Sequence, residues 1–467
     1  MLDFVKSRPI PLFLALISAA FYLSFGYDLD RSDFIKLSML YAALFFLAYK
    51  ILQISKRDFW LLAGFGLVFR LLLLLSIPNL SQDFYRFLWD GRLLLQGINP
   101  YLFTPDMFVE NSGLYFEKAT ITMHQAEALY EGMGSLNAGH FSNYPPINQV
   151  FFAIAALISG KSILGAVIVL RIIMILADIG ILYFGRKLLK ALELNPHNIF
   201  WYFLNPFVIL ELTGNLHFEG VMLFFLIWSL YLLHNKNWFW AAILLGISIS
   251  VKLIPLLFLP LFFRFFIKKG LFGKGFWTLK KFGWVTLATV LAAFAPFLSG
   301  QFVENFGATI GLWFQEFEFN ASVHYVIRWI SFKTVGWNLI ETTGKILPAI
   351  VLLAVLLLSF FRKNTSLQQL ITAMLFAISL YLLLSTTVHP WYIATPLLLS
   401  VFTKYKFPIV WSLMVMVSYS AYGNAGFQEN LWLIAIEYTI VIGFAIWELC
   451  FRKKSNSEKE HFETATP

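Results

Sequence analysis

Charged residues are scarce in this sequence, and cysteine is almost absent. Asp, Glu, Lys and Arg make up 13% of the 467 residues, against about 25% in ordinary soluble proteins, which excludes a soluble protein of about three domains. Cys450 is the single cysteine, so an internal disulfide scaffold is excluded too. The sequence has no P-loop, G-x-G-x-x-G turn, H-E-x-x-H helix or C-x-x-C pair. ATP-driven transport and redox chemistry therefore have no support.

Apolar residues are abundant, at 59% of the chain with 51 phenylalanines. They gather into repeated runs that approach the length of a membrane span. This pattern excludes a disordered, coiled-coil or collagen-like chain. We expect an all-α polytopic membrane protein with about 14 transmembrane helices, in a range of 11 to 14, at 9–26, 34–54, 58–77, 162–185, 197–212, 219–234, 237–252, 253–267, 282–299, 347–361, 367–385, 391–403, 407–421 and 431–451.

The basic residues orient these spans. A net charge of +9 is explained by Lys and Arg in cytoplasmic loops, and no nucleic-acid partner is expected. With the N-terminus inside, the acidic segment 79–144 lies outside. Every later basic cluster then falls inside if the run 147–159 is a juxtamembrane helix. We expect one transmembrane domain at 1–451 in the inner (plasma) membrane, an extracytoplasmic loop with juxtamembrane helices at 79–160, cytoplasmic termini, and a polar, disordered tail at 452–467.

Polar segments that are unusual for simple connections all fall on the outer face in this topology. The cytoplasmic loops are short and contain mainly Lys, Arg and Asn. This asymmetry predicts an active site on the outer side, at the membrane boundary. The polar segments are 81–86 with 89–91, 143–146, 211–219, 317–320 and 387–392.

Asp83 follows the third apolar run by about five residues. An acid at the lipid–water boundary is partly desolvated, which raises its basicity and suits a general base. A solvated loop acid or a helix N-cap is the alternative. Arg86 and Asp90 are four residues apart and would share a helix face as an ion pair. This pair is more typical of a structural contact, although both residues are candidates for substrate binding.

Three ionisable residues mark the middle of the chain. His217 and Glu219 lie where an apolar run emerges, and they could hold a metal ion, a substrate hydroxyl or a structural hydrogen bond. Lys252 is the lone cation in the run 238–267, and Pro255 breaks the helix soon after it. A buried lysine needs an anionic partner, which is either a protein acid or a phosphate of a ligand.

Two later positions are similar candidates. Arg328 could likewise meet a phosphate. His389 precedes Pro390 at the start of a span and is either structural or a hydrogen-bond donor to a phosphate oxygen. Trp391 and Tyr392 are more typical of an aromatic belt at the membrane interface than of a sugar platform.

Taken together, these segments resemble the C-type (GT-C) glycosyltransferases, which are integral membrane enzymes that take a sugar from a polyprenyl-phosphate carrier. The greatest similarity is to bacterial polyprenol-phosphate-mannose-dependent mannosyltransferases and the GPI mannosyltransferase I family. The resemblance covers most of the chain as a pattern. It is carried by SQDFYRFLWDGRLLLQGINPY (81–101), NYPP (143–146), NPF and ELTGNLHFEG (within 205–220), SVKLIPLLFLP (250–260), WFQEFEFNASVHYVIRW (313–329) and TTVHPWY (386–392).

The resemblance implies that an acid in the first long external loop, Asp83 here, is the general base. It also implies an inverting transfer of a hexose, by analogy mannose, from a polyprenyl-phosphate donor to a hydroxyl of a glycan or glycolipid acceptor. This loop has no D-x-D pair, so a divalent cation stays an open alternative without support in the sequence, and no cofactor is assigned. Two spans also precede the one that leads into this loop, whereas in many relatives the loop follows the first span.

The reaction itself suggests roles for the remaining candidates. The donor phosphate needs cations or hydrogen-bond donors, and we assign it to Lys252, Arg328 and His389. The hydroxyls of the sugar or acceptor are assigned to His217, Glu219, Glu318 and Asn320, and Tyr392 is a further substrate contact. A transporter or flippase of lipid-linked saccharides is the alternative, and an envelope-assembly scaffold is a third reading. The membrane lipids are the other expected partners.

Overall fold

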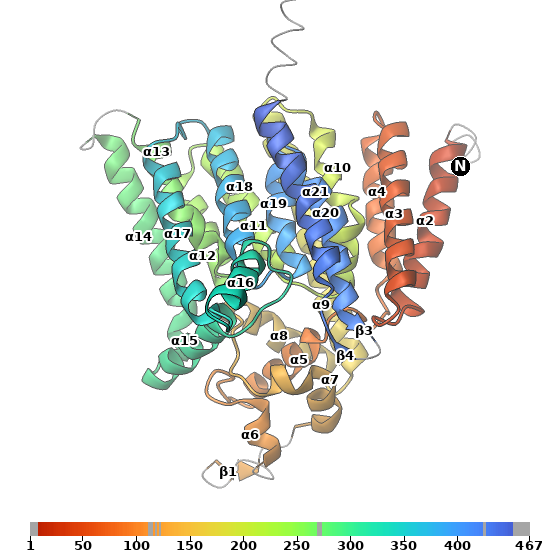
Figure 1. Ribbon diagram of the computed structural model, residues 1–467, viewed down its shortest axis with the longest axis vertical. Helices are drawn as coiled ribbons and strands as arrows, with labels where there is room; N and C mark the ends of the chain where they lie inside the picture. The colour runs from red at the N-terminus through yellow and green to blue at the C-terminus, as the bar shows by residue number, and fades with distance from the viewer. Residues whose placement is uncertain are drawn as a thin grey trace, which may run out of the picture.

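A layer of long helices stands above a smaller layer of short helices in this computed structural model (Figure 1). The structure describes residues 8–110, 115–116, 119–120, 123–268, 273–423 and 426–451, so the tail at 452–467 and part of the loop at 79–160 lie outside the described residues. Nearly all described elements are helical. The expected all-α fold class is therefore confirmed, and the protein is a multi-pass membrane protein.

The upper layer contains α2 (Pro9–Tyr27), α3 (Phe34–Ile54), α4 (Phe59–Leu72), α9 (Ile163–Ala191), η1 (Pro196–Ile199), α10 (Phe200–Phe203), η2 (Val208–Gly214), α11 (Glu219–His234), α12 (Trp238–Val251), η3 (Ile254–Leu261), α13 (Phe262–Phe266), α14 (Lys274–Phe294), η4 (Ala295–Phe297), α17 (Ile340–Phe360), α18 (Leu367–Leu384), η5 (Pro390–Ile393), α19 (Ala394–Ser400), α20 (Phe407–Met414), η6 (Val415–Ala421) and α21 (Leu431–Cys450). The lower layer contains α5 (Asp83–Leu95), α6 (Pro105–Glu110), α7 (Ala126–Ala138), α8 (Pro146–Ser159), α15 (Gly300–Gln315) and α16 (Val323–Thr334). The structure also has two short antiparallel hairpins, one of β1 (Tyr115–Phe116) with β2 (Ala119–Thr120), the other of β3 (Tyr422–Gly423) with β4 (Gly426–Phe427).

The number of spans is lower when it is counted from helix length. Six described helices are long and apolar enough to cross a membrane, namely α2, α3, α9, α17, α18 and α21. Two sharply bent pairs, η2 with α11 and α14 with α15, raise the number to eight if each is one span. Five shorter apolar helices are not included in that number. The figure of 14 is therefore not confirmed.

Proline explains why several apolar runs are not single long helices. The run 253–267 contains Pro255 and Pro260 and folds as a 3-10 helix followed by the short α13. Pro206 separates α10 from the π-helical segment η2. Proline lacks the backbone N–H and clashes with the preceding turn. Such breaks turn the chain and bring polar residues to the ends of short helices.

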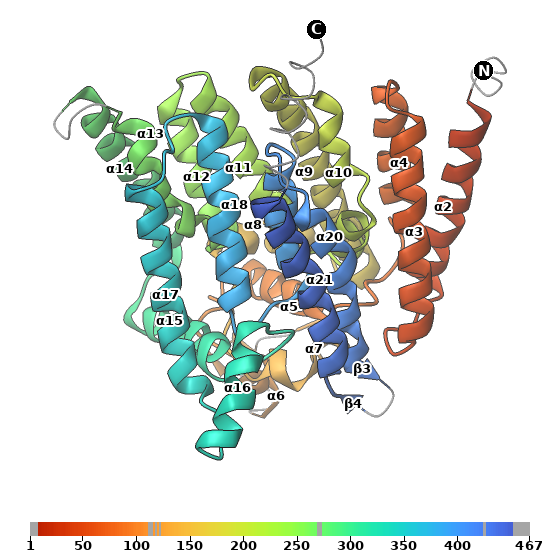
Figure 2. The same cartoon turned by 45° about the horizontal axis from the view of Figure 1, so that its top comes forward.

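The described ends of the chain lie on one side of the upper layer (Figure 2). Pro9 begins α2 and Cys450 ends α21 at this side, whereas α5 to α8 lie at the opposite side. The chain therefore crosses the upper layer an even number of times.

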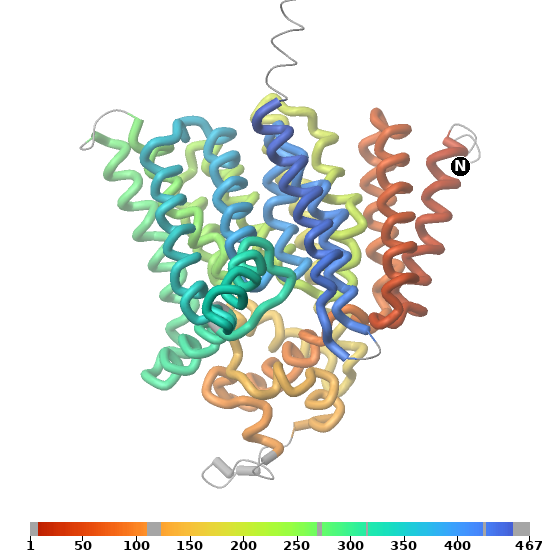
Figure 3. Tube along the Cα trace, in the orientation of Figure 1, coloured from red at the N-terminus to blue at the C-terminus, as the bar shows by residue number. Residues whose placement is uncertain are grey.

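The segment that follows α4 forms most of the lower layer, traced in orange in Figure 3. Within it, α8 packs against α5, and the rings of Phe87 and Phe152 stack at 4.6 Å. Gly91 permits this close approach, because a Cβ at this position would lie 2.3 Å from the carbonyl oxygen of Phe152. The 147–159 run is thus an element of the lower layer, continuous in the chain with the long helix α9.

Three charged residues inside the upper layer are held by the protein itself. Arg70 of α4 pairs with Asp178 of α9 at 2.7 Å, with side chains 0% and 1% exposed. Arg171 of α9 donates to the carbonyls of Leu74, Ser76, Thr213 and Gly214. Charges at such depth require partners. Here the contacts of Arg70, Asp178 and Arg171 hold α4 and η2 against α9. The chain segments that adjoin α4 and η2 are thereby brought close together.

Candidate active site

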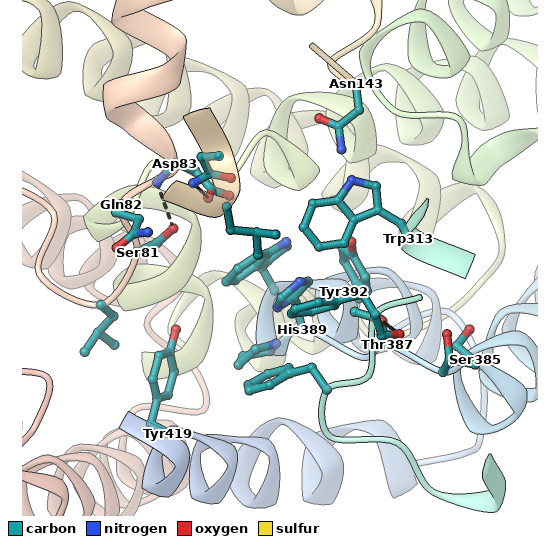
Figure 4. Close-up of a pocket in the computed structure, with 18 of the residues that line it drawn as sticks. Ser81, Gln82, Asp83, Asn143, Trp313, Ser385, Thr387, His389, Tyr392 and Tyr419 are labelled. Atoms are coloured by element: carbon teal, nitrogen blue, oxygen red, sulfur yellow. Dashed lines mark hydrogen bonds between the residues drawn. The ribbon is translucent and has the colours of Figure 1, made fainter. Parts of the chain in front are cut away.

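A cavity of about 870 Å³ lies where the two layers meet. Its wall is built from segments far apart in the sequence, and Figure 4 shows many of them converging. The wall comprises the turn at 30–32, residues 80–83, residues 136–145 in part, residues 252–257 in part, Ile310, Trp313, Phe317, Phe319, Tyr381, residues 385–392 except Val388, Tyr419, Tyr422, Gly423, Gly426 and Phe427.

Asp83 begins α5 and lies in this wall. Its side chain is half-buried, and Asn137 donates to its carboxylate from 3.5 Å. Burial raises the pKa of the Asp83 carboxyl, and the positive charge of Lys252 partly opposes that rise. A carboxylate with a raised pKa that faces a cavity can accept a proton from a bound hydroxyl.

Lys252 reaches the cavity because α12 ends at Val251. The backbone of Lys252 is extended, with φ −146° and ψ 138°, and the 3-10 helix with Pro255 follows. Its ammonium lies 3.0 Å from the Glu219 carboxylate, and its side chain is 19% exposed whereas that of Glu219 is 0% exposed. It also lies 5.7 Å from the ring centroid of Tyr144. The anionic partner of Lys252 is thus a protein acid, while the ammonium still faces the cavity.

An aromatic stack supports the centre of the wall. The Trp391 ring lies between His217, at 3.6 Å and 17°, and His389, at 4.5 Å and 5°. His389 and Trp391 line the cavity, whereas His217 lies behind them, 3.7 Å from Glu211. Glu211 in turn accepts a hydrogen bond from the Tyr419 hydroxyl at 2.9 Å. The stack fixes the planes of both imidazoles.

A short parallel bridge closes one side of the cavity. Phe319 donates from its backbone N–H to Thr386 at 3.1 Å and accepts from Val388 at 2.8 Å. The Thr387 hydroxyl donates to the carbonyl of Phe317 at 2.9 Å. These bonds join the segment before α16 to the segment before η5 and hold their aromatic side chains against His389, whose ring centre is 5.1 Å from that of Phe319.

The structure brings together four of the eleven candidates from the sequence. Asp83, Lys252, His389 and Tyr392 all line the cavity. Glu219 and His217 are buried immediately behind it, against Lys252 and Trp391. The cavity wall does not include the other five, which are Arg86, Asp90, Glu318, Asn320 and Arg328.

Arg86 and Asp90 form the expected ion pair, at 2.8 Å and almost fully buried. Arg86 also donates to the carbonyls of Asn137 and His140, which are themselves in the cavity wall. Burial and the nearby Arg86 charge lower the pKa of His140 to about 4. His140 is therefore neutral near pH 7. The ion pair shapes the wall from behind.

Glu318, Asn320 and Arg328 belong to a separate polar cluster. The guanidinium of Arg328 in α16 pairs with the carboxylate of Glu318 at 2.5 Å. The Asn320 side chain donates to Glu437 at 3.3 Å, and its backbone N–H donates to Glu429 at 2.6 Å. This cluster binds residues 318–328 to α21 and the turn before it.

Some cavity residues had no signal in the sequence. Arg31 belongs to a short turn between two apolar runs, and Tyr419 and Tyr422 lie at the end of another run. No spacing or motif distinguishes them from interface residues. The part of the chain that the structure describes holds no group of three or more His, Cys, Asp or Glu side chains placed to hold a metal ion.

The sequence model for the alpha-(1->6)-mannopyranosyltransferase N-terminal domain matches residues 34–268. This match covers just over half of the chain. The chain belongs to the alpha-(1->6)-mannopyranosyltransferase family. The resemblance to membrane mannosyltransferases is thereby confirmed. The match runs from α3 to the loop after α13 and includes Asp83, Glu219 and Lys252, whereas His389 and Tyr392 lie beyond it.

A curated relative within this mannopyranosyltransferase family is similar over a longer stretch. The chain is 22% identical over 342 residues to alpha-(1->6)-mannopyranosyltransferase A of Mycobacterium tuberculosis (strain ATCC 25618 / H37Rv). The aligned stretch is 70% of this chain, and it spans 62% of the length of that relative.

Proposed function

We propose that this protein transfers a mannosyl residue from a polyprenyl-phosphate donor to a hydroxyl of a glycan acceptor, with inversion at the anomeric carbon. The observation that carries the proposal is the convergence of Asp83, Lys252, His389 and Tyr392 on one cavity at the layer boundary. Membership of a mannopyranosyltransferase family supports the sugar and the reaction class. The donor carrier and the inverting course rest on the chemistry of the site.

In the proposed step the acceptor oxygen attacks the anomeric carbon as Asp83 takes its proton. The bond between that carbon and the phosphate oxygen breaks, and the polyprenyl phosphate leaves with the bonding electrons. Lys252 neutralises the leaving phosphate, and His389 donates a hydrogen bond to it. A phosphate is a weakly basic leaving group, so no strong general acid is required. Attack on the face opposite the leaving group inverts the anomeric centre.

The cavity offers a separate apolar wall to the donor lipid. Leu253, Ile254 and Leu257 follow Lys252 at the start of η3, and Ile310 of α15 lines the same cavity. An isoprenoid chain gains about 25 cal/mol for each Å² of apolar surface that it buries. The lysine at the head of this wall is therefore placed where the phosphate of a lipid-bound donor would lie. We further propose that this cavity faces the extracytoplasmic side of the inner membrane, with both termini in the cytoplasm.

The test is a transfer assay on the purified protein with polyprenyl-phosphate mannose and a short mannoside acceptor. We expect release of polyprenyl phosphate and an elongated mannoside. Asp83→Asn should lower turnover by about 10²- to 10⁴-fold, the usual contribution of a general base. Glu127→Gln changes an exposed acid on α7, outside the cavity, and should leave turnover unchanged.

Two outcomes would contradict the proposal. Near-normal turnover by Asp83→Asn removes this residue from the mechanism. Movement of the intact lipid-linked sugar across a proteoliposome membrane without bond cleavage identifies the protein as a flippase instead.

A further inference from the structure

The end of the cavity beside the α2–α3 turn differs from the end that carries Lys252. It contains Arg31, Tyr419 and Tyr422, together with polar atoms of the chain before α5. In Figure 4, Ser81, Gln82, Asp83 and Tyr419 lie on one side, and Trp313, Thr387 and Ser385 lie on the other. The proposed base is thus on the side of Tyr419, which is where an acceptor hydroxyl must arrive.

The turn that presents Arg31 is held by its own hydrogen bonds. The Asp30 carboxylate accepts from the backbone N–H and the hydroxyl of Ser32, both at 2.8 Å. Asp33 caps α3 by accepting from the N–H of Lys36 at 3.0 Å. A turn with these bonds presents its residues at defined positions. Arg31 is therefore part of the wall and not a freely moving surface side chain.

The Arg31 side chain is held in position by contacts that use only one of its hydrogen-bond donors. Its guanidinium carbon lies 4.2 Å from the centre of the Tyr422 ring, and Nη1 donates to the carbonyl of Leu80 at 3.3 Å. Among the described residues, this guanidinium makes no other hydrogen bond. The group has five N–H donors in a planar fork. The remaining donors can therefore serve a ligand in the cavity.

The charges around Arg31 favour a neutral ligand. Asp30 and Asp83 line the same cavity as Arg31. One cation beside two acids does not favour an anionic group. A sugar ring has hydroxyls for both donors and acceptors and an apolar face for an aromatic side chain.

Two tyrosines supply the aromatic surface. The rings of Tyr419 and Tyr422 are 5.9 Å apart, and Phe427 lies 5.5 Å from Tyr422. Gln82 is anchored through its amide nitrogen to the carbonyl of Met133 at 2.8 Å. Its amide oxygen accepts no hydrogen bond from the described residues and can serve as an acceptor for a ligand. Aromatic faces with a few oriented polar groups are typical of small-molecule sites.

We propose that this end of the cavity, formed by Arg31, Tyr419, Tyr422 and Gln82, binds a neutral sugar ring of the acceptor glycan. The inference rests on the proposed transfer reaction and assigns its second substrate. The Lys252 end holds the lipid phosphate, the Arg31 end holds the acceptor, and Asp83 lies between the two substrates. The turn between α2 and α3, which precedes the matched family segment at 34–268, thereby contributes to acceptor binding.

The test separates the two substrates by their Michaelis constants. Arg31→Ala and Tyr422→Ala should each raise the acceptor KM by about tenfold, the loss of one good hydrogen bond or ring contact. The donor KM should change by less than about twofold. Arg57→Ala removes an exposed arginine beyond the other end of α3 and should change neither constant. Tyr422→Phe keeps the ring and should stay near the unmodified value.

Each alternative result has a distinct meaning. A higher donor KM in Arg31→Ala would make this arginine a phosphate ligand and overturn the inference. Unchanged acceptor KM in both alanine variants would overturn it as well, while leaving the transfer reaction intact. Failure of the unmodified protein to transfer mannose would contradict the proposed function itself. If an alanine variant unfolds, the conservative variants Arg31→Lys and Tyr422→Phe replace it in the test. A higher acceptor KM for Arg31→Lys, with that of Tyr422→Phe unchanged, supports the inference. An unchanged acceptor KM in both variants overturns it.

Discussion

Asp83 and Lys252 line the cavity, and Glu219, buried behind Lys252, completes a charged group of three. Lys252 is held by Glu219 at 3.0 Å and lowers the pKa of Asp83 that burial has raised. The negative charge of Glu219 acts in the opposite direction on that pKa. A base must be deprotonated to work, so turnover is lost as the pH falls through the pKa of Asp83. The two neighbours therefore control the pH range of the reaction.

Because Lys252 and Glu219 shift the pKa of Asp83 in opposite directions, removal of each charge should move the pH profile of kcat/KM in opposite directions. Lys252→Met should shift the acidic limb of kcat/KM to higher pH, because the charge that lowers the pKa of Asp83 is gone. Glu219→Gln should shift the limb to lower pH, because a charge that raises that pKa is gone. Lys252→Met should also lose about 10- to 100-fold in kcat/KM through the donor phosphate.

Lys236→Met replaces an exposed lysine on the opposite side of the molecule and should leave the profile in place. If both cavity variants moved the limb in the same direction, Asp83 would not be the group that titrates.

At the level of elements, the cavity depends on the close packing of α5 against α8. Gly91 of α5 faces the backbone of Phe152, and a Cβ there would lie 2.3 Å from the carbonyl oxygen. The ion pair of Arg86 and Asp90 on the same helix holds the chain at 137–142 through hydrogen bonds to Asn137, His140 and Ser142. A shift of α5 would therefore move both Asp83 and the opposite wall.

Substitution of Gly91 should expose this dependence. Gly91→Ala forces the two backbones apart and should destabilise the protein by about 1–3 kcal/mol. Thermal unfolding in detergent would measure the loss. Gly283→Ala is the matched control on α14, where an added Cβ meets nothing within 4 Å. Equal unfolding temperatures for the two variants would contradict the packing argument.

At the scale of the whole molecule, the two layers create a site on one face. The described ends of the chain and the lower layer lie on opposite sides of the long helices. A transporter needs access from both sides, whereas a transferase for a lipid-linked donor needs a cavity at one boundary. The arrangement is suited to the second requirement.

Cysteine labelling can determine the orientation in a cell. In a Cys450→Ser background, a cysteine at Glu131 of α7 should react with a membrane-impermeant maleimide added to intact cells. A cysteine at Asn235, after α11, should react only once the membrane is opened. Both native side chains are exposed. The reverse pattern would place the cavity on the cytoplasmic face and exclude the proposed orientation.

The sequence alone determined the class of the protein and several local features. Apolar runs and scarce charges predict an all-helical membrane protein, since each span must satisfy its backbone polar groups internally. The spacing of Arg86 and Asp90 predicts their ion pair, and Pro255 predicts a break after Lys252. Each of these rests on residues close together in the chain, where spacing defines geometry.

Only the tertiary structure decided which polar residues share the cavity. Arg328 and Glu318 satisfy each other's charge away from it, whereas Arg31 enters it from a turn without any motif. The length of an apolar run also could not show that Pro260 leaves a short 3-10 helix in place of a span. The physical reason is that the partner of a buried charge is chosen by contacts between different segments of the folded chain, such as Lys252 with Glu219 and Arg70 with Asp178, and no local pattern encodes those contacts.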